Sequence, residues 1–428
     1  MEILLLMALF FAAMFLGVPM AFAMGAAALI FVWLVGSLPP VLLAQRMFYG
    51  LDSFPLMAVP LFILAGELMN RGGISESILA LASRILNRVR AGLAQANVLA
   101  SMLFAGIAGS AAADASGLGA IEIDMMKRDG YPVDYAAAVT AASAILGPII
   151  PPSIVAVVYA TSTTNTSVGA LFAGGVVPGA LLGLAMMIVV YYTSKRMDIK
   201  SPYESGIKLT RDQLLRSVAA LLMPGIILGG IYGGAFTPTE AAAIAVLYSL
   251  IICFVFFRTL NLRQLYDILV KAGITTASVF WIVGAAASFA AIATTHGAAA
   301  YLASVMSGLT TSPWVFLLVV NVFLLIIGLF MDTIAAVTVF APILAPIAMR
   351  YGIDPTHFGI IFIINLCIGM VTPPMGIVLF IVTAITRGLT VERLVKAIWP
   401  FLIALLIAMA LITYVPSLSL WLPKLLGY

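Results

Sequence analysis

Two proline-containing segments hold the residues whose types and spacing could do chemistry in this chain. Residues 147–153 (GPIIPPS) and 369–375 (GMVTPPM) each interrupt an apolar stretch, and they lie 222 positions apart. A helix stopped at such a segment ends in carbonyls without intrahelical partners, and its prolines supply no amide donors. Such carbonyls are hard oxygen ligands for a small dehydrated cation such as Na⁺. Because lipid offers no hydrogen-bonding partner, these paired breaks predict a transport site.

Polar residues in two further apolar stretches could complete the cation sites. Ser110, Asp114 and Asp332 fall within residues 91–126 and 314–349, where each stretch has to turn. A charge at membrane depth is rare unless it is functional or faces water. Asp332 is therefore a candidate ion ligand, whereas helix capping is the slightly better interpretation of Asp114. The alternative for the breaks themselves is that they only kink membrane helices for packing.

The composition is that of a polytopic membrane protein. Of 428 residues, 63% are hydrophobic and only 9% are charged, and the mean hydropathy is +1.18. Soluble domains are about 45 to 50% apolar. Charge-poor stretches such as 218–257, 275–295 and 394–415 are long enough for helical spans, which need about 20 residues. Residues 1–16 lack a basic n-region, so they are expected to be a retained span and not a signal peptide.

The net charge of +4 does not indicate nucleic-acid binding, because the basic residues are spread over short loops. If those loops are cytoplasmic, they hold 18 of the 21 Lys and Arg residues, which leaves Arg46, Arg350 and Lys424 outside. The expected topology is a multi-pass protein of the bacterial inner membrane with both termini in the periplasm.

The expected fold class is all-α and integral to the membrane, with about ten transmembrane helices and two re-entrant helical hairpins. The first half, residues 1–194, has two short spans, a third span, a hairpin at about 91–126, a broken span at about 135–159 and a last span. The hairpin begins and ends at basic loops, and its Gly-rich middle suits a turn packed within protein. A hydrophilic cytoplasmic linker, residues 195–216, follows.

The second half, residues 217–428, repeats the pattern with a hairpin at about 314–349 and a broken span at about 358–385. Because it begins on the cytoplasmic side and the first half begins outside, the repeat is expected to be inverted. The 222-residue offset aligns Ser110 with Asp332 and Gly130 with Gly352, and a similar offset aligns Gly73 with Gly297.

Common enzyme templates are absent from the sequence. It contains no HExxH, GxSxG or P-loop motif and no GxGxxG after a strand, so any pumping has to draw on an ion gradient and not on ATP bound by this chain. Cys253 and Cys367, like His296 and His357, show no metal-ligand spacing, and both cysteines are expected in the packed core. No organic cofactor is expected.

Three other polar groups have structural interpretations. Glu67 and Arg71 lie four residues apart, which predicts an ion pair on one helical face. Glu240 follows a Thr-Pro-Thr sequence and is expected to satisfy the amides of a helix N-terminus. Residues 161–167 (TSTTNTS) are either a solvated loop, which is favoured, or the lining of a periplasmic vestibule.

Five stretches spread over most of the chain carry a family resemblance: residues 53–71, 105–119, 147–153, 233–243 (GGAFTPTEAAA) and 352–376. In these stretches the chain resembles the large membrane subunit of TRAP transporters, the tripartite ATP-independent periplasmic carriers. The resemblance implies an elevator-type carrier, in which a transport domain made of both hairpins and both broken spans slides against a scaffold. It implies that Na⁺ drives uptake of an organic acid such as a C4-dicarboxylate or a sialic acid.

The resemblance also implies ligand sets, several of them through backbone carbonyls. Na⁺ would be bound in the first half at Ser110, Gly147, Ile150 and Pro152, and in the second half at Asp332, Gly369, Thr372, Pro374 and Met375. The substrate carboxylate is expected between the hairpin tips, near half-helix N-termini that favour anions. Candidates for that region are Asp114, Ser116, Ser153 and Thr333.

Two partners follow from the same resemblance: a small four-helix membrane subunit that extends the scaffold and a periplasmic protein that delivers the substrate. A close alternative is a stand-alone Na⁺/carboxylate symporter of the same superfamily, which needs no binding protein. A remote alternative of another class is a membrane-embedded enzyme that uses Asp114 and Asp332 as a carboxylate dyad.

Overall fold

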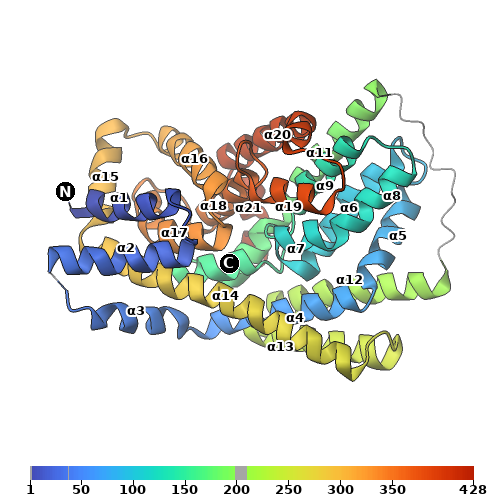
Figure 1. Ribbon diagram of the computed structural model, residues 1–428, viewed down its shortest axis with the longest axis horizontal. Helices are drawn as coiled ribbons and strands as arrows, with labels where there is room; N and C mark the ends of the chain where they lie inside the picture. The colour runs from blue at the N-terminus through green and yellow to red at the C-terminus, as the bar shows by residue number, and fades with distance from the viewer. Residues whose placement is uncertain (1, 37, 198–209) are drawn as a thin grey trace.

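The protein folds into helices throughout the part that the structure describes (Figure 1). This computed structural model describes residues 2–36, 38–197 and 210–428, and no strand occurs among them. The all-α prediction is therefore confirmed. Eight helices there are long and apolar enough to cross a membrane, and five shorter apolar helices accompany them. Residues 198–209 of the expected linker lie outside the described residues.

The helices of the two halves have the following bounds. The first half contains α1 (Glu2–Phe15), α2 (Met20–Val35), α3 (Val41–Leu51), α4 (Ala58–Arg71), α5 (Ile74–Leu86), α6 (Gly92–Ala108), α7 (Ala111–Ser116), α8 (Leu118–Arg128), α9 (Val133–Ala144), α10 (Ile154–Ser162) and α11 (Val168–Arg196). The second contains α12 (Arg211–Tyr232), α13 (Pro238–Leu250), α14 (Leu262–Thr295), α15 (Ala298–Leu309), α16 (Pro313–Phe330), α17 (Thr333–Arg350), α18 (Pro355–Gly369), α19 (Ile377–Ile385), α20 (Val391–Tyr414) and α21 (Ser417–Leu425).

Left-handed glycines recur at corresponding places in the two halves. Gly73 (φ 72°) and Gly297 (φ 75°) precede α5 and α15, and Gly130 (φ 84°) and Gly352 (φ 74°) precede α9 and α18. Glycine takes up this conformation without steric cost. The pairs matched in the sequence therefore share a backbone conformation as well as a position in the order of elements.

The halves differ where α3 and α4 correspond to the single helix α14. Pro55 lies in the short 3₁₀ turn Phe54–Met57 between α3 and α4, and its missing amide and fixed φ interrupt the helix there. In contrast, α14 contains no proline and runs unbroken for 34 residues, from a capping box between Asn261 and Gln264. It packs against α2, α3, α4 and α17 and lies with α3, α4 and α13 along one side of the molecule (Figure 1).

A buried asparagine joins each hairpin to the broken span of its own half. We call α6, α7 and α8 the first hairpin and α16 and α17 the second. Asn97 on α6 accepts a hydrogen bond from Ser143 on α9 (2.9 Å) and donates one to Thr140 (2.7 Å). On α16, Asn321 accepts one from Asn365 on α18 (2.8 Å). All five residues are buried, and an apolar setting makes loss of one such partner costly.

Asn97→Ala is expected to lower the unfolding temperature of the detergent-purified protein. The substitution leaves the buried Ser143 and Thr140 hydroxyls without that partner, at a cost on the order of 1–3 kcal/mol. The matched control is Asn165→Ala, because Asn165 is exposed. An unfolding temperature unchanged in both variants would show that the asparagine does not stabilise the contact between hairpin and span.

Candidate ion and substrate site

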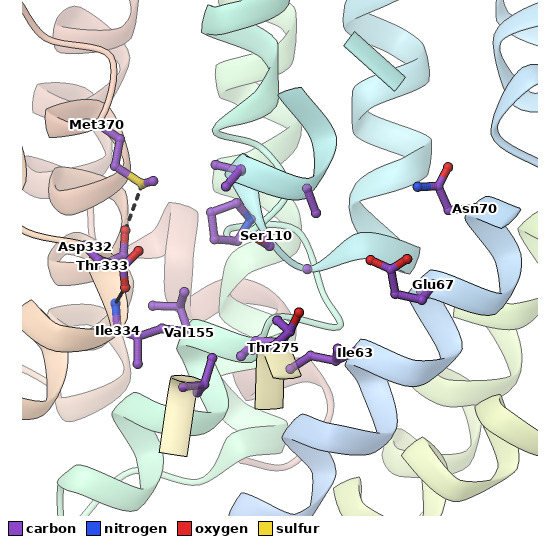
Figure 2. A pocket seen from close by; sticks show the side chains of 18 of the residues that line it. Ile63, Glu67, Asn70, Ser110, Val155, Thr275, Asp332, Thr333, Ile334 and Met370 are labelled. Atoms are coloured by element: carbon purple, nitrogen blue, oxygen red, sulfur yellow. Dashed lines mark hydrogen bonds between the residues drawn. The ribbon is translucent and has the colours of Figure 1, made fainter. Parts of the chain in front are cut away.

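A cavity of about 120 Å³ lies where both hairpins, both breaks and helices α4 and α14 meet (Figure 2). Glu67 and Asn70 of α4 project from one side, Asp332 and Thr333 of the second hairpin lie on the other, and Ser110 of the first hairpin lies between them. The residues that the 222-position offset aligns, Ser110 and Asp332, thus line one shared space. Pro148 and Met370 bring the two breaks into the same lining.

The first hairpin tip and the first break are in direct backbone contact. A Cβ atom at Gly147 would lie 3.2 Å from the carbonyl oxygen of Ser110, and one at Gly109 would lie 3.2 Å from the carbonyl oxygen of Pro152. Among the described residues, no donor bonds to the carbonyls of Gly147, Ile150 or Pro152. Three carbonyl oxygens with open lone pairs therefore lie in the break against which the tip packs, and such oxygens suit a dehydrated cation.

The second hairpin and the second break also touch through glycine. A Cβ atom on Gly369 would lie 2.6 Å from the Cα of Gly328, so α18 and α16 approach as closely as backbones can. Thr333 adds a contact from its hydroxyl to the Met370 sulfur at 2.9 Å (Figure 2). The two breaks also share a cis Pro-Pro peptide bond, at 151–152 and 373–374.

The expected ligands of the second half are partly engaged by the protein itself. The Gly369 carbonyl accepts the amide of Thr372 at 3.0 Å, and the Thr372 hydroxyl donates to the Ile368 carbonyl at 2.7 Å. The Gly369 carbonyl keeps a second lone pair for a cation, and the Thr372 hydroxyl oxygen, which acts here as a donor, keeps its own lone pairs. Asp332 caps α17 by accepting the Ile334 amide at 2.9 Å, and its carboxylate still lines the cavity.

Most of the expected ligands lie beside the cavity and not in its wall. Ser110 and Asp332 belong to the lining. The others occupy the two breaks without lining it: Gly147, Ile150, Pro152, Gly369, Thr372, Pro374 and Met375. Each break therefore reaches the cavity through one residue, Pro148 or Met370, while its expected ligands lie beside the space in which a larger molecule could lie.

Only one of the four substrate-region candidates, Thr333, lines the cavity. Ser153 instead caps α10 with its side chain, and the exposed Ser116 donates to a carbonyl within α7. Asp114 is 2% exposed on α7, and neither of its carboxylate oxygens has a hydrogen-bond partner among the described residues. The expected capping role of Asp114 is wrong, because Ser110 occupies the N-cap position of that helix.

The lining contains two acids and no basic side chain. These acids are Asp332 and Glu67, and Glu67 forms a salt bridge with Lys271 of α14 at 2.8 Å. The predicted pairing of Glu67 with Arg71 is wrong, because the fold brings a lysine from the other half alongside α4. Residue spacing could not predict that ion pair, because its members lie in different halves of the chain.

The positive ends of two helices face the cavity. Ile154 and Val155, from the first turn of α10, line it together with Thr333 and Ile334, from the first turn of α17. First-turn amides have no intrahelical acceptor, and the helix dipole adds partial positive charge. The α17 end already carries the Asp332 carboxylate as its cap, whereas the α10 end is capped only by the neutral Ser153 hydroxyl, so the α10 end is the one that favours an anion.

Sequence reasoning did not predict the lining residues of α4 and α14, which include the apolar Ile63 and Val279. Asn70 and Gly66 contribute from α4 and Thr275 from α14. The available signal was a polar side chain, Asn70 or Thr275, near the end of an apolar span. That signal is weak, because polar residues at span ends commonly face solvent.

The remaining polar predictions have clear outcomes. No group of three His, Cys, Asp or Glu side chains suited to a metal occurs in the described ranges. His296 lies 2.9 Å from Glu2, and the buried His357 lies 2.6 Å from Ser419. Glu240 forms a capping box at the start of α13, which confirms its predicted role.

Gly369→Ala is expected to lower the unfolding temperature in Na⁺-free choline chloride, because the added methyl group would collide with Gly328. Overpacking of this kind costs about 1–3 kcal/mol. Gly308→Ala is the matched control, since a Cβ atom there meets nothing within 4 Å. Equal unfolding temperatures for the two variants would contradict the close approach of α16 and α18.

Known proteins resemble this chain over almost its whole length. Residues 7–418 match the family described as "Tripartite ATP-independent periplasmic transporter, DctM component". The chain is 42% identical to the C4-dicarboxylate TRAP transporter large permease protein DctM of Pseudomonas aeruginosa, covering 90% of each chain. It is 44% identical to the isethionate TRAP transporter permease protein DctMQ of Oleidesulfovibrio alaskensis, covering 95% of this chain but only 64% of that longer relative.

Among solved structures, the YdaH transporter of Alcanivorax borkumensis shares the fold. It superposes with a TM-score of 0.65 over 90% of both chains at 16% identity. At 16% identity this similarity shows a shared fold, whereas the family match and the sequence identities above show the family. This chain is a multi-pass membrane protein, not an enzyme, and it belongs to the DctM family of TRAP transporter permease components.

Proposed function

We propose that this chain is the carrier subunit for Na⁺-coupled uptake of a small organic acid. The observation that carries the proposal is the single cavity shared by both hairpin tips and both breaks. Relatives named for C4-dicarboxylate and isethionate favour a carboxylate or sulfonate as substrate, and a sialic acid is a further candidate. No organic cofactor takes part.

One Na⁺ site would lie between each hairpin tip and the break of the same half, two sites in all. In the first half, the ligands would be Ser110 and the carbonyls of Gly147, Ile150 and Pro152, which accept no hydrogen bond from the described residues. In the second half, Asp332 would supply the charge, with the lone pairs left at Gly369 and Thr372 and oxygens of Pro374 and Met375 completing the shell. Hard oxygen ligands of this kind suit Na⁺.

The chemistry of the lining supports coupling between cation and anion. An organic anion would enter a cavity whose acids are Asp332, which repels it, and Glu67, whose charge is paired with Lys271. Na⁺ bound at Asp332 would offset that repulsion, and the helix end at Val155 would hold the anionic group. Binding of the anion would thus depend on prior binding of Na⁺.

Movement would follow an elevator mechanism. Both hairpins and both broken spans would form the transport domain, with the asparagine contacts of Asn97 and Asn321 holding each pair together. Helices α4 and α14, which line the opposite wall of the cavity, would belong to the scaffold. The halves, residues 1–194 and 217–428, would form an inverted repeat, with both hairpins re-entrant and both termini in the periplasm.

The proposed partners complete the system. A small four-helix membrane subunit would extend the scaffold, and a periplasmic binding protein would deliver the acid to the permease in the bacterial inner membrane. The stand-alone symporter remains the competing proposal, because nothing in the cavity itself requires a delivered substrate.

Asp332→Asn is expected to weaken stabilisation by Na⁺ without uncapping α17, since asparagine caps helices as well as aspartate. A ligand at 100 times its Kd stabilises the native state by about 2.7 kcal/mol. The measurement is the unfolding temperature in NaCl against choline chloride at matched ionic strength. Ser110→Ala should reduce the response too, and the exposed Asp267→Asn should not. An identical Na⁺ response in every variant would remove Asp332 and Ser110 from the ligand sets.

Uptake in proteoliposomes separates the two carrier proposals. With the small subunit and binding protein present, an inward Na⁺ gradient should drive accumulation of the acid, and omission of the binding protein should abolish it. Accumulation by this chain alone, at an undiminished rate, would instead favour the stand-alone symporter.

A further inference from the structure

A second pocket, of about 250 Å³, lies between α3, α10, α14 and α17. We call it the outer pocket, because Arg46 belongs to the three basic residues that the loop-charge pattern leaves outside. Its polar lining residues are Arg46, Tyr49, Thr161, Ser162, Thr294 and Thr338. Thr161 and Ser162 belong to the polar run 161–167, for which a vestibule was the alternative interpretation.

The outer pocket and the central cavity lie along one seam of the molecule. On α14, Thr275 and Val279 line the central cavity, whereas Val283, Ala287 and Ala291 line the outer pocket. Each of these five residues lies four positions from the next, so successive members are neighbours on the surface of α14, and the row runs along the helix while turning gradually around its axis. Twelve positions separate Val279 from Ala291, or about 18 Å along a helix.

Helix α17 shows the same arrangement from the opposite wall. Ile334 lines the central cavity, and Thr338 and Pro342, each four residues further on, line the outer pocket. Helices α14 and α17 pack against each other. The two spaces are therefore the two ends of one interface between the proposed scaffold and the proposed transport domain.

The chemistry of the outer pocket is opposite to that of the central cavity. Arg46 is the one charged residue among its described lining residues, and no ion pair to its guanidinium occurs in the described ranges. The hydroxyls of Thr161 and Thr338 already donate to carbonyls of their own helices. Donors left for a ligand are the guanidinium and the hydroxyls of Tyr49 and Ser162. A guanidinium fork matches the oxygens of a carboxylate or sulfonate.

We propose that the outer pocket is a second binding site for the organic anion, at which Arg46 receives the carboxylate or sulfonate before it reaches the central cavity. This inference rests on the proposed function, because it assumes an organic anion that enters from the outer side. A cationic pocket there would raise the local concentration of anion at the end of the seam. The central cavity, where Glu67 is paired with Lys271 and Asp332 is not paired with a base, would accept the anion only after Na⁺ is bound.

The test introduces a thiol into the outer pocket by Ala291→Cys and compares its labelling rates with two methanethiosulfonates, anionic sulfonatoethyl and cationic trimethylammonioethyl. Both native cysteines, Cys253 and Cys367, are buried and unpaired, so the background is low. We expect the anion-to-cation rate ratio to fall roughly five- to tenfold when Arg46→Gln is added. Isethionate or succinate at millimolar concentration should also slow labelling by an uncharged reagent, and only while Arg46 is present.

Ser278→Cys provides the matched control, since Ser278 is exposed on α14 and lines neither space. The anion-to-cation rate ratio at Ser278→Cys should be the same with and without Arg46→Gln. An unchanged ratio there would also show that the Arg46→Gln variant folds. An unchanged ratio at Ala291→Cys, or labelling that neither anion slows, would overturn the proposal. The effect of Na⁺ on the unfolding temperature is a separate measurement. If Na⁺ does not stabilise the unsubstituted protein, the proposed function is contradicted, and the labelling ratio still tests the outer pocket.

Discussion

The structure depends on one constraint: backbone oxygens freed inside an apolar protein need partners. Each break ends a helix at a Pro-Pro sequence that supplies no amides. In the first half the hairpin tip at Ser110 lies directly against the break, and the carbonyls of Gly147, Ile150 and Pro152 accept no donor from the described residues. The proposed Na⁺ would be a suitable partner for such oxygens, and it would then hold each hairpin tip against its break.

Close backbone approach makes that arrangement possible. Gly147 lets the first tip approach to a distance that would be tight for a Cβ atom, and Gly369 packs against α16 with no room for one. Buried asparagines then link each hairpin to its broken span through Asn97 and Asn321. The glycines let the two backbones come close, and the asparagine hydrogen bonds fix how the hairpin is oriented on its span. A buried hydrogen bond restricts sliding of the hairpin along the span, which apolar contacts alone would allow. Each pair therefore has the contacts of a unit that can move as a whole.

The charged residues along the interface between the proposed scaffold and transport domain differ between its two ends. The central cavity holds Asp332 and Glu67, the latter paired with Lys271, and the outer pocket holds Arg46. On the proposals above, an anion would be attracted at the outer end and repelled by Asp332 at the centre unless a cation were bound there. The coupling of cation and anion would then come from electrostatics along the path and not from a dedicated basic residue in the cavity.

The sequence by itself determined the membrane setting, the all-helical class, the two breaks and the family. These features depend on local chemistry: apolar content, proline and glycine positions, and motifs read along the chain. The capping box at Glu240 was equally local. Only the tertiary structure decided which side chains share a space. Glu67 pairs with Lys271, which lies 204 positions away, and not with its helical neighbour Arg71. Asp114 turns into the protein interior, and Thr275 and Arg46 line spaces that close only when helices from both halves meet. Such choices depend on packing between segments far apart in the chain, and no periodicity within one segment encodes them.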